Sequence, residues 1–538
     1  MVKLNYEGLK DKAAWEKAGF VTPQYDVEQV RANTAAAPTW LHIGAGNIFR
    51  GFICSLQQEL LNNGDTDKGI VAVAPMDGYV LKHVMGDADY LTVQVQMHRD
   101  GTLDKEVYAS LVDGLDLSLP EDYARTCEIF AMPSLQMLSF TVTEKGYSIT
   151  DIQGNLTEQV KKDIANGPEH PANTMALVAG FLYRRFKAGK LPMTLASMDN
   201  FSHNGAKLKD SVVTVAKGWA ENKLVEAEFV DYVSDESIVS FPWSCIDKIT
   251  PRPDAKIGKM IEDSGIEGAA SVVTEAGTYA ANYVNAEVPQ YLVVEDRFTN
   301  GRPPLEKAGV HLTDRETVDN FERMKVCTCL NPLHTSLAVF GCLLDFPSIS
   351  SEMEDKSLNA LVTRIGKVEG MPVVTDPGIV NPMDFLNEVL DERLPNPYLP
   401  DTPQRIATDT SQKLSIRFGE TIKEYVASAD LDLDNLVGIP LTHAAWLRYC
   451  LGVSDAGEPL ALSADPMTPD MQKSLAGVTL GGDEAVARAA CKSILNNKVI
   501  FGVDLYEVGL GERVEDYFVE MLAGPGAVKA TLNKYFPA

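Results

Sequence analysis

The segment "TWLHIGAGNIFRGFICSLQQELLNNG" (39–64) constrains the fold of this chain more than any other. An apolar run predicts a buried strand, Gly44 and Gly46 follow it directly, and the apolar spacing after them predicts a helix that stops at Gly64. The first glycine permits a tight turn, and the second lets the backbone approach a pyrophosphate at the helix N-terminus. We therefore expect the first βα unit of a dinucleotide-binding sheet, although Phe49 replaces the third glycine of GxGxxG. An ordinary βα turn is the alternative.

Further strand and helix patterns alternate through the first 300 residues. "GIVAVAPMD" (69–77), "LQMLSFTVTEKGY" (135–147) and "LPMTLASMDN" (191–200) each predict a strand that ends in polar residues. Residues 91–112 alternate with period two around an Asp-Gly pair, which predicts a hairpin. Alternating strands and helices indicate an α/β fold, a mostly parallel sheet with helices on both faces.

Asp77 follows the second predicted strand of this sheet. An acid at that place hydrogen-bonds the ribose hydroxyls of a dinucleotide and repels a 2′-phosphate, so it favours NAD over NADP. A solvated turn aspartate is the alternative.

The sequence changes character after the connector "TNGRPPLEKAG" (299–309), because most later segments have helical periodicity. We therefore predict two domains. Residues 1–300 form a Rossmann-type NAD-binding domain with an N-terminal extension, and residues 301–538 form a mainly helical domain for substrate and catalysis.

The net charge of −27 excludes the class of nucleic-acid-binding proteins, since phosphate would be repelled. The sequence has no run of about 18 uninterrupted apolar residues, so we expect no membrane partner. The start of the chain has no export signal, so we expect a cytoplasmic protein whose cysteines are reduced. Cys327 and Cys329 with His334 are a weak metal pattern without a second cysteine pair, so we expect core residues there and no metal.

The segment "KVCTCLNPLH" (325–334) places an ammonium, an amide and an imidazole close together among apolar residues. Hydride transfer from an alcohol needs a base and donors to the reacting oxygen, and lysine and asparagine supply those groups. Asn331 and His334 share a helix face, but Lys325 would lie on another side of an ideal helix. Pro332 predicts a distortion, and a π-bulge would turn Lys325 toward the site. Alternatively, Lys325 extends to solvent and Asn331 caps a helix break.

Several motifs occur together in a fixed order. They are "GAGNIFR" (44–50), "TVTEKGY" (141–147), "SMDNFSHNG" (197–205), "FPWSCIDKITP" (241–251), "VVEDRF" (293–298), "KVCTCLNPLH" (325–334) and "RIATDTSQK" (405–413). The set resembles the polyol-specific long-chain dehydrogenases, the family of mannitol 2-dehydrogenase, fructuronate reductase and tagaturonate reductase. The resemblance covers roughly residues 38 to 535 and implies a Rossmann-type N-terminal domain, a mostly α-helical C-terminal domain and a site in the cleft between them.

The resemblance also implies roles for individual residues. The general base is Lys325, and the amides that hold the reacting oxygen are Asn200 and Asn331. The substrate-binding positions are His334, Asp247, Ile246, Arg405 and Lys413. The cofactor-binding positions are Gly44, Gly46, Asn47, Ile48, Asp77, Glu144 and Lys145. The family spaces its base and asparagine as K-x4-N, whereas this chain has K-x5-N, which the predicted bulge would absorb.

The expected cofactor is NAD, and the expected substrate is a small sugar acid or polyol. The likeness favours NADH-dependent reduction of fructuronate to mannonate, with mannitol 2-dehydrogenase or tagaturonate reductase as the alternatives. A non-catalytic sensor that binds NAD or a sugar acid is a further alternative from a different class.

Overall fold

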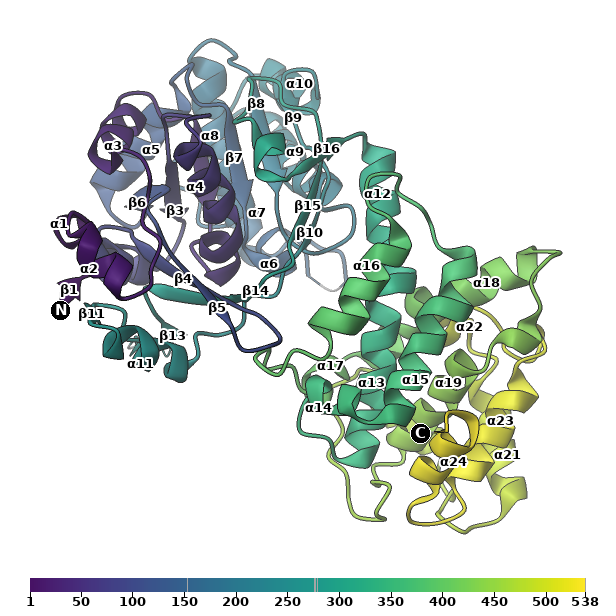
Figure 1. Ribbon diagram of the computed structural model, residues 1–538. Helices are drawn as coiled ribbons and strands as arrows, with labels where there is room; N and C mark the ends of the chain where they lie inside the picture. Colours follow the sequence, from purple (N-terminus) through teal and green to yellow (C-terminus); the bar gives the residue numbers. More distant parts are fainter. Residues whose placement is uncertain (152, 275–276, 278, 538) are drawn as a thin grey trace. The chain divides into compact units, whose positions relative to one another are not determined.

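The computed structural model describes residues 1–151, 153–274, 277 and 279–537, and it divides into two compact units (Figure 1). We call Met1–Asp319 the N-terminal unit and Asn320–Ala538 the C-terminal unit. The division lies inside helix α12 (Arg315–Arg323), beyond the connector at 299–309. The chain after residue 300 stays with the N-terminal unit because strand β16 (His311–Thr313) pairs with strand β15 (Tyr291–Glu295) there.

In the described residues, the N-terminal unit contains a six-stranded sheet in the order β6-β3-β2-β7-β8-β9, and each neighbouring pair is parallel. Its strands are β2 (Trp40–Ile43), β3 (Ile70–Ala74), β6 (Leu111–Asp116), β7 (Met137–Phe140), β8 (Met193–Ser197) and β9 (Val239–Ser240). The strand order reverses between β2 and β7, which is the doubly wound arrangement of dinucleotide-binding folds. The predicted α/β fold class is confirmed.

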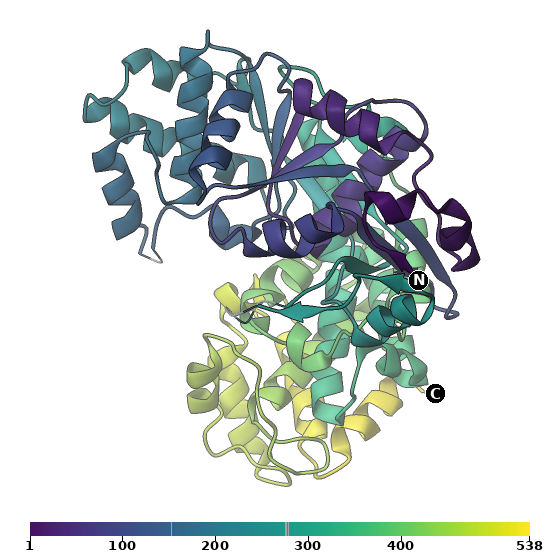
Figure 2. The ribbon, with the colours of Figure 1, turned by 90° about the vertical axis from the view of Figure 1, so that its left-hand side faces the viewer.

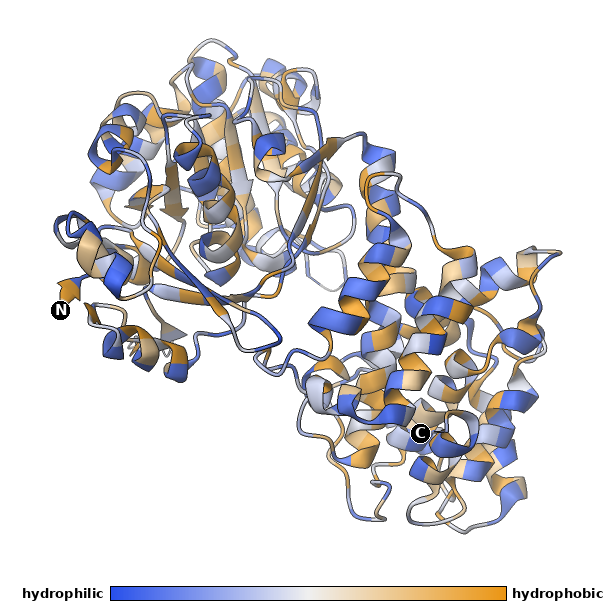
Figure 3. Cartoon of the chain, in the orientation of Figure 1, coloured by the Kyte–Doolittle hydropathy of each residue, from blue (hydrophilic) through white to orange (hydrophobic). Residues whose placement is uncertain are grey.

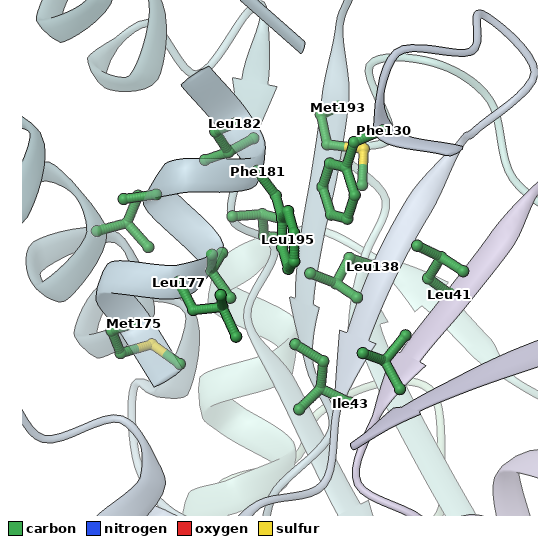
Figure 4. Packing of buried hydrophobic residues seen from close by; sticks show 14 of the residues in the cluster. Leu41, Ile43, Phe130, Leu138, Met175, Leu177, Phe181, Leu182, Met193 and Leu195 are labelled. Atoms are coloured by element: carbon green, nitrogen blue, oxygen red, sulfur yellow. The ribbon is translucent and has the colours of Figure 1, made fainter. Parts of the chain in front are cut away.

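Helices cover both faces of this sheet (Figure 2). Leu41 and Ile43 of β2 belong to one buried core, whereas Trp40 belongs to a second core with the helices that follow β2. In Figure 4, strand residues Leu138 and Leu195 lie beside side chains of α8 in the first core. The flanking helices are η1 (Phe49–Ile53, π-helical), α4 (Cys54–Asn62), α5 (Pro120–Phe130), α8 (Thr174–Lys187) and α9 (Asn204–Glu221). A sheet buried on both faces explains why the strands read as continuous apolar runs.

Two smaller sheets complete the N-terminal unit. β4 (Thr92–Met97) and β5 (Leu103–Tyr108) pair in antiparallel register and confirm the predicted hairpin, and β14 (Tyr283–Glu287) joins β4 in parallel. β10 (Ser244–Asp247) pairs with β15 in the other sheet.

The C-terminal unit is mostly helical, as predicted from its periodicity. Its longer helices include α13 (Asn331–Leu344), α15 (Lys356–Arg364), α18 (Glu420–Ala427), α19 (Gly438–Cys450), α21 (Glu484–Ile494), α23 (Gly511–Met521) and α24 (Ala527–Tyr535). Hydrophilic and hydrophobic residues alternate along these helices in Figure 3, as expected where one stripe packs inward. The π-helical segments of this unit include η5 (Met324–Cys329), η6 (Ile365–Gly370), η8 (Val389–Arg393) and η10 (Ser415–Gly419).

One helical stretch among the described residues, Arg315–Leu344, is long and apolar enough to cross a membrane by length and composition alone. In its most apolar window, 83% of the residues are buried inside the structure. That burial is typical of a core helix.

Arg185 of α8 holds together the amino-terminal side of the sheet. Its side chain is fully buried and donates to the carbonyls of Phe130, Met132, Leu135 and Pro192 at 2.7–2.9 Å. These carbonyls belong to the segments that lead into β7 and β8. A single guanidinium therefore satisfies four backbone acceptors that water does not reach.

Replacing Arg185 by Met should lower the free energy of unfolding of the N-terminal unit by roughly 3–5 kcal/mol, because buried carbonyls are left without donors. Thermal unfolding followed by calorimetry measures the effect. The neighbouring Arg184→Met is the matched control, since Arg184 pairs with the exposed Glu169 and should change the melting temperature little. Equal melting temperatures of the two variants would contradict this role for Arg185.

Candidate active site

The turn after β2 has a backbone that only glycine can adopt. Gly44 has φ of +106°, and a Cβ there would lie 2.3 Å from the carbonyl oxygen of Thr141. Gly46 differs, because a Cβ at that position would meet no atom of the described chain within 4 Å. The first glycine is thus required by the fold, and the second leaves the backbone open to a close-lying phosphate.

Phe49 stands where the fingerprint has its third glycine, and the structure gives a reason. Its ring is buried and stacks on the ring of His42 with centroids 4.0 Å apart. The two ring nitrogens of His42 lie 2.6 Å from Ser139 Oγ and 2.8 Å from Thr141 Oγ1. Burial lowers the pKa of His42 well below its ordinary value, so the ring is neutral. Phe49 therefore covers a buried polar link between β2 and β7, which the sequence did not reveal.

Asn47 fixes the same turn to more distant parts of the chain. Its Nδ2 donates to the carbonyl of Pro251 at 3.0 Å, and its Oδ1 accepts from Nη2 of Arg50 at 3.1 Å. The buried Arg50 also donates to the carbonyl of Ala281 at 2.6 Å. Ile48 is partly buried and packs against the core. Both residues thus shape the turn, and their contact with cofactor stays a prediction.

The predicted cofactor and amide residues follow neighbouring strands at one edge of the sheet. Asp77 comes after β3, Gly44 to Ile48 after β2, Glu144 and Lys145 after β7, and Asn200 after β8. Parallel strands bring their carboxyl ends to the same edge, and this edge is where doubly wound sheets bind nucleotides. Asp77, Glu144 and Lys145 are exposed there. The order of the strands therefore places the predicted cofactor positions along one edge of the sheet.

Asp199 joins the turn after β7 to the segment that carries Asn200. Its carboxylate accepts from the backbone N–H groups of Val142 (2.8 Å) and Thr143 (3.1 Å) and from the Tyr147 hydroxyl (2.6 Å). Burial raises the pKa of Asp199, and the three hydrogen bonds oppose that shift. The sequence analysis missed this residue. Its position before Asn200 in "SMDN" was the available signal.

Asn204 joins the segment of Asn200 to the strand that carries the predicted substrate residues Ile246 and Asp247. Its Nδ2 donates to the carbonyl of Asp199 and to the carbonyl and hydroxyl of Ser244, each at 3.0 Å. Its Oδ1 accepts from the Ser244 N–H at 3.1 Å. The start of β10 is thereby tied to the segment of Asn200, while Ile246 and Asp247 are buried.

In the C-terminal unit, the predicted distortion near Lys325 is confirmed. Lys325 lies in the π-helical segment η5, and its carbonyl accepts from the N–H of Leu330 five residues later, at 3.1 Å. Asn331 and Pro332 begin the next helix, α13, where proline has no hydrogen bond to lose. Lys325 is 1% exposed, so the alternative in which it extends to solvent is excluded.

Cations surround His334 on α13. They are Arg417, Arg405, Arg393 and Lys413, in decreasing order of their effect on its pKa. Burial is the larger cause, and together they lower the pKa of His334 to about 3. Its Nε2 lies 3.6 Å from a carboxylate oxygen of Asp401, which also pairs with Arg405. A neutral imidazole among cations can donate to a substrate oxygen but cannot serve as an acid near neutral pH. The sequence analysis missed Arg393.

The cysteines near this helix have ordinary surroundings. Cys329 is buried and its thiol contacts the carbonyl of Pro382 at 3.7 Å, and burial raises its pKa to about 12. Among the described residues, no group of three or more His, Cys, Asp or Glu side chains is placed to hold a metal ion.

Comparison with known proteins adds the family. Residues 38–307 match the model of the mannitol dehydrogenase Rossmann domain, and residues 317–521 match that of the mannitol dehydrogenase C-terminal domain. D-mannonate oxidoreductase of Thermotoga maritima is 50% identical over 99% of this chain and 99% of that protein. Mannitol 2-dehydrogenase of Neosartorya fischeri is 27% identical over 94% and 93%.

Solved structures with the same fold include mannitol 2-dehydrogenase of Pseudomonas fluorescens in a ternary complex with NAD and D-mannitol. It has a TM-score of 0.72 and 24% identity, and the match covers 99% of both chains. A substrate-free D-sorbitol dehydrogenase has a TM-score of 0.77 and 24% identity over 95% of this chain and 97% of the other.

A direct test of the electrostatics is the titration of His334 by NMR of the histidine rings, with His334→Gln to assign the signal. We expect neutral imidazole across the whole range in which free histidine, of pKa about 6.5, takes up its proton. Because the native pKa is lowered to about 3, the unfolded state binds the proton first, and stability from this group falls as pH drops from about 6.5 toward 3. Titration at the free value would contradict the cation cluster.

Proposed function

The chain belongs to the mannitol dehydrogenase family of NAD-dependent oxidoreductases acting on secondary alcohols, and we propose that it interconverts D-fructuronate and D-mannonate by hydride transfer at C2 of the ketose. The 50% identity to a D-mannonate oxidoreductase supports this substrate pair. Mannitol 2-dehydrogenases are more distant relatives, so oxidation of mannitol is the second candidate, followed by tagaturonate reduction.

The observation that carries the proposal is the cation cluster around His334. The chain has a net charge of −27, yet three arginines and a lysine gather at this histidine. A neutral ketose would gain little from that arrangement. A sugar acid carries a carboxylate, which arginine binds through two parallel hydrogen bonds.

We assign the proton transfer to Lys325. NAD supplies or accepts the hydride when bound. In the oxidative direction the Lys325 amine takes the hydroxyl proton, and in the reductive direction its ammonium returns a proton to the oxygen. Asn200 and Asn331 provide neutral amide donors for that oxygen as its charge develops. The lysine needs no metal for this role.

The cofactor roles follow the strand order. The Gly44–Ile48 turn supports the pyrophosphate, Asp77 binds the ribose hydroxyls, and Glu144 and Lys145 lie toward the nicotinamide. We also propose that the enzyme acts in the cytoplasm. A non-catalytic sensor is disfavoured, because a sensor has no need for amide donors to a reacting oxygen.

The test is NADH oxidation by the purified protein with D-fructuronate, D-tagaturonate or D-fructose. We expect kcat/KM for fructuronate to exceed that for fructose by roughly 100-fold, since a charge-assisted bond contributes about 3 kcal/mol. A preference for fructose would move the enzyme to the mannitol branch, and a preference for tagaturonate would change the substrate. No turnover with any of the three would favour the sensor.

Lys325→Met tests the base with a side chain of similar length that cannot carry a proton. We expect kcat to fall by about 10²–10⁴, the usual contribution of acid–base catalysis. NADH affinity, measured by fluorescence, should stay at the wild-type value. Turnover close to that of the wild type would exclude Lys325 as the base.

A further inference from the structure

Arg417 differs from the other cations around His334 in its bonding partners. Arg405 pairs with the carboxylate of Asp401, and Lys413 donates to backbone carbonyls of its own loop. The guanidinium of Arg417 donates to the hydroxyl of Thr335 at 2.5 Å, and within the described parts of the chain it has no carboxylate partner. A cation that the protein itself leaves without an opposite charge is suited to a ligand anion.

Burial makes a guanidinium without a counter-charge energetically costly when no ligand is bound. Arg417 is partly buried, and burial lowers its pKa to about 10. Lys413 adds charge of the same sign nearby, since Arg417 contributes to the lowering of the pKa of Lys413, which burial dominates. An anion placed against Arg417 would reduce both the desolvation cost and the repulsion.

Thr335 sets the direction of this guanidinium. Its Oγ1 accepts from Arg417 and donates to the carbonyl of Asn331 at 2.9 Å. Arg417 is thereby held to the first turn of α13, the turn that carries Asn331 and His334. One of its five donors is used on Thr335, so the others are available for a carboxylate.

The segment that carries Arg417 also packs against the segment that carries Lys325. Arg417 lies in η10, which contacts η5, and the Thr421 hydroxyl of the following helix α18 donates to the carbonyl of Cys327 in η5 at 3.4 Å. Both cations are therefore presented by adjoining π-helical segments, a feature often found at functional sites.

We propose that Arg417 binds the carboxylate at the end of the substrate far from the reacting carbon and so selects sugar acids over neutral ketoses. This inference rests on the proposed function. It assigns the selection to Arg417, because Arg405 is already paired with Asp401 and Lys413 already donates to backbone carbonyls.

The experiment compares Arg417→Gln and Arg417→Lys with the wild type, using D-fructuronate, D-fructose and D-fructose 6-phosphate with NADH. Arg417→Gln should lower kcat/KM for fructuronate by about 100-fold, mainly through KM, and change the value for fructose less than about threefold. Arg417→Lys should retain part of the fructuronate activity, because lysine keeps the charge but loses the bidentate geometry. Lys423→Gln on α18 is the matched control, since it removes one exposed charge that pairs with Glu420.

The outcomes separate the two proposals. Wild-type enzyme that fails with fructuronate refutes the proposed function itself. Wild-type preference for fructuronate combined with equal losses on fructose and fructuronate in both variants refutes only the role of Arg417. If Arg417→Gln does not fold, the same comparison in Arg417→Lys decides, with at least a tenfold rise in KM expected for fructuronate alone. A wild-type preference for the phosphate ester would show that the site binds a phosphate and would overturn the inference.

Discussion

The arrangement of the N-terminal unit depends on the reversal of strand order between β2 and β7. The connections that follow the strands on the two sides of this point run in opposite directions. They leave a crevice at the carboxyl ends of the strands. Gly44 lies directly at the reversal, against the carbonyl of Thr141. The buried link from His42 to Ser139 and Thr141 fixes the two strands at that place, with Phe49 packed over it. The predicted cofactor positions that follow β2 and β7 lie at this junction, and Asp77 follows the neighbouring strand β3.

Buried polar side chains then align the turns along the edge. Asp199 accepts hydrogen bonds from backbone groups of another segment, and Asn204 both donates to and accepts from such groups. Such residues cost desolvation energy unless all their bonds are made, so they hold the turns in one arrangement. The turn after β7, the segment of Asn200 and the strand of Asp247 are connected through these two side chains.

In the C-terminal unit, several basic side chains of the candidate site lie in π-helical segments. Lys325, Arg393 and Arg417 each lie in a π-helical segment. One extra residue per turn rotates the side chains relative to a regular helix, so cations separated in sequence can face a common region. Gathering like charges is unfavourable for the protein alone, and a bound anion would reduce that repulsion. Burial lowers the pKa of His334, and the field of these cations lowers it further.

The sequence by itself determined the elements and the chemistry that depend on local patterns. The strand–glycine–helix unit, the Asp-Gly hairpin and the distortion before Pro332 all follow from backbone preferences within a few residues. Only the tertiary structure decided which polar groups act together. Asp199 bonds to a turn 57 residues earlier, and Phe49 acts through a histidine that is itself bonded to another strand. Arg393 and Arg417 both lower the pKa of His334 although they lie 59 and 83 residues after it in the chain. Hydrogen bonds and interactions between charges depend on the distance between groups in space. A short stretch of sequence does not give that distance for residues far apart in the chain.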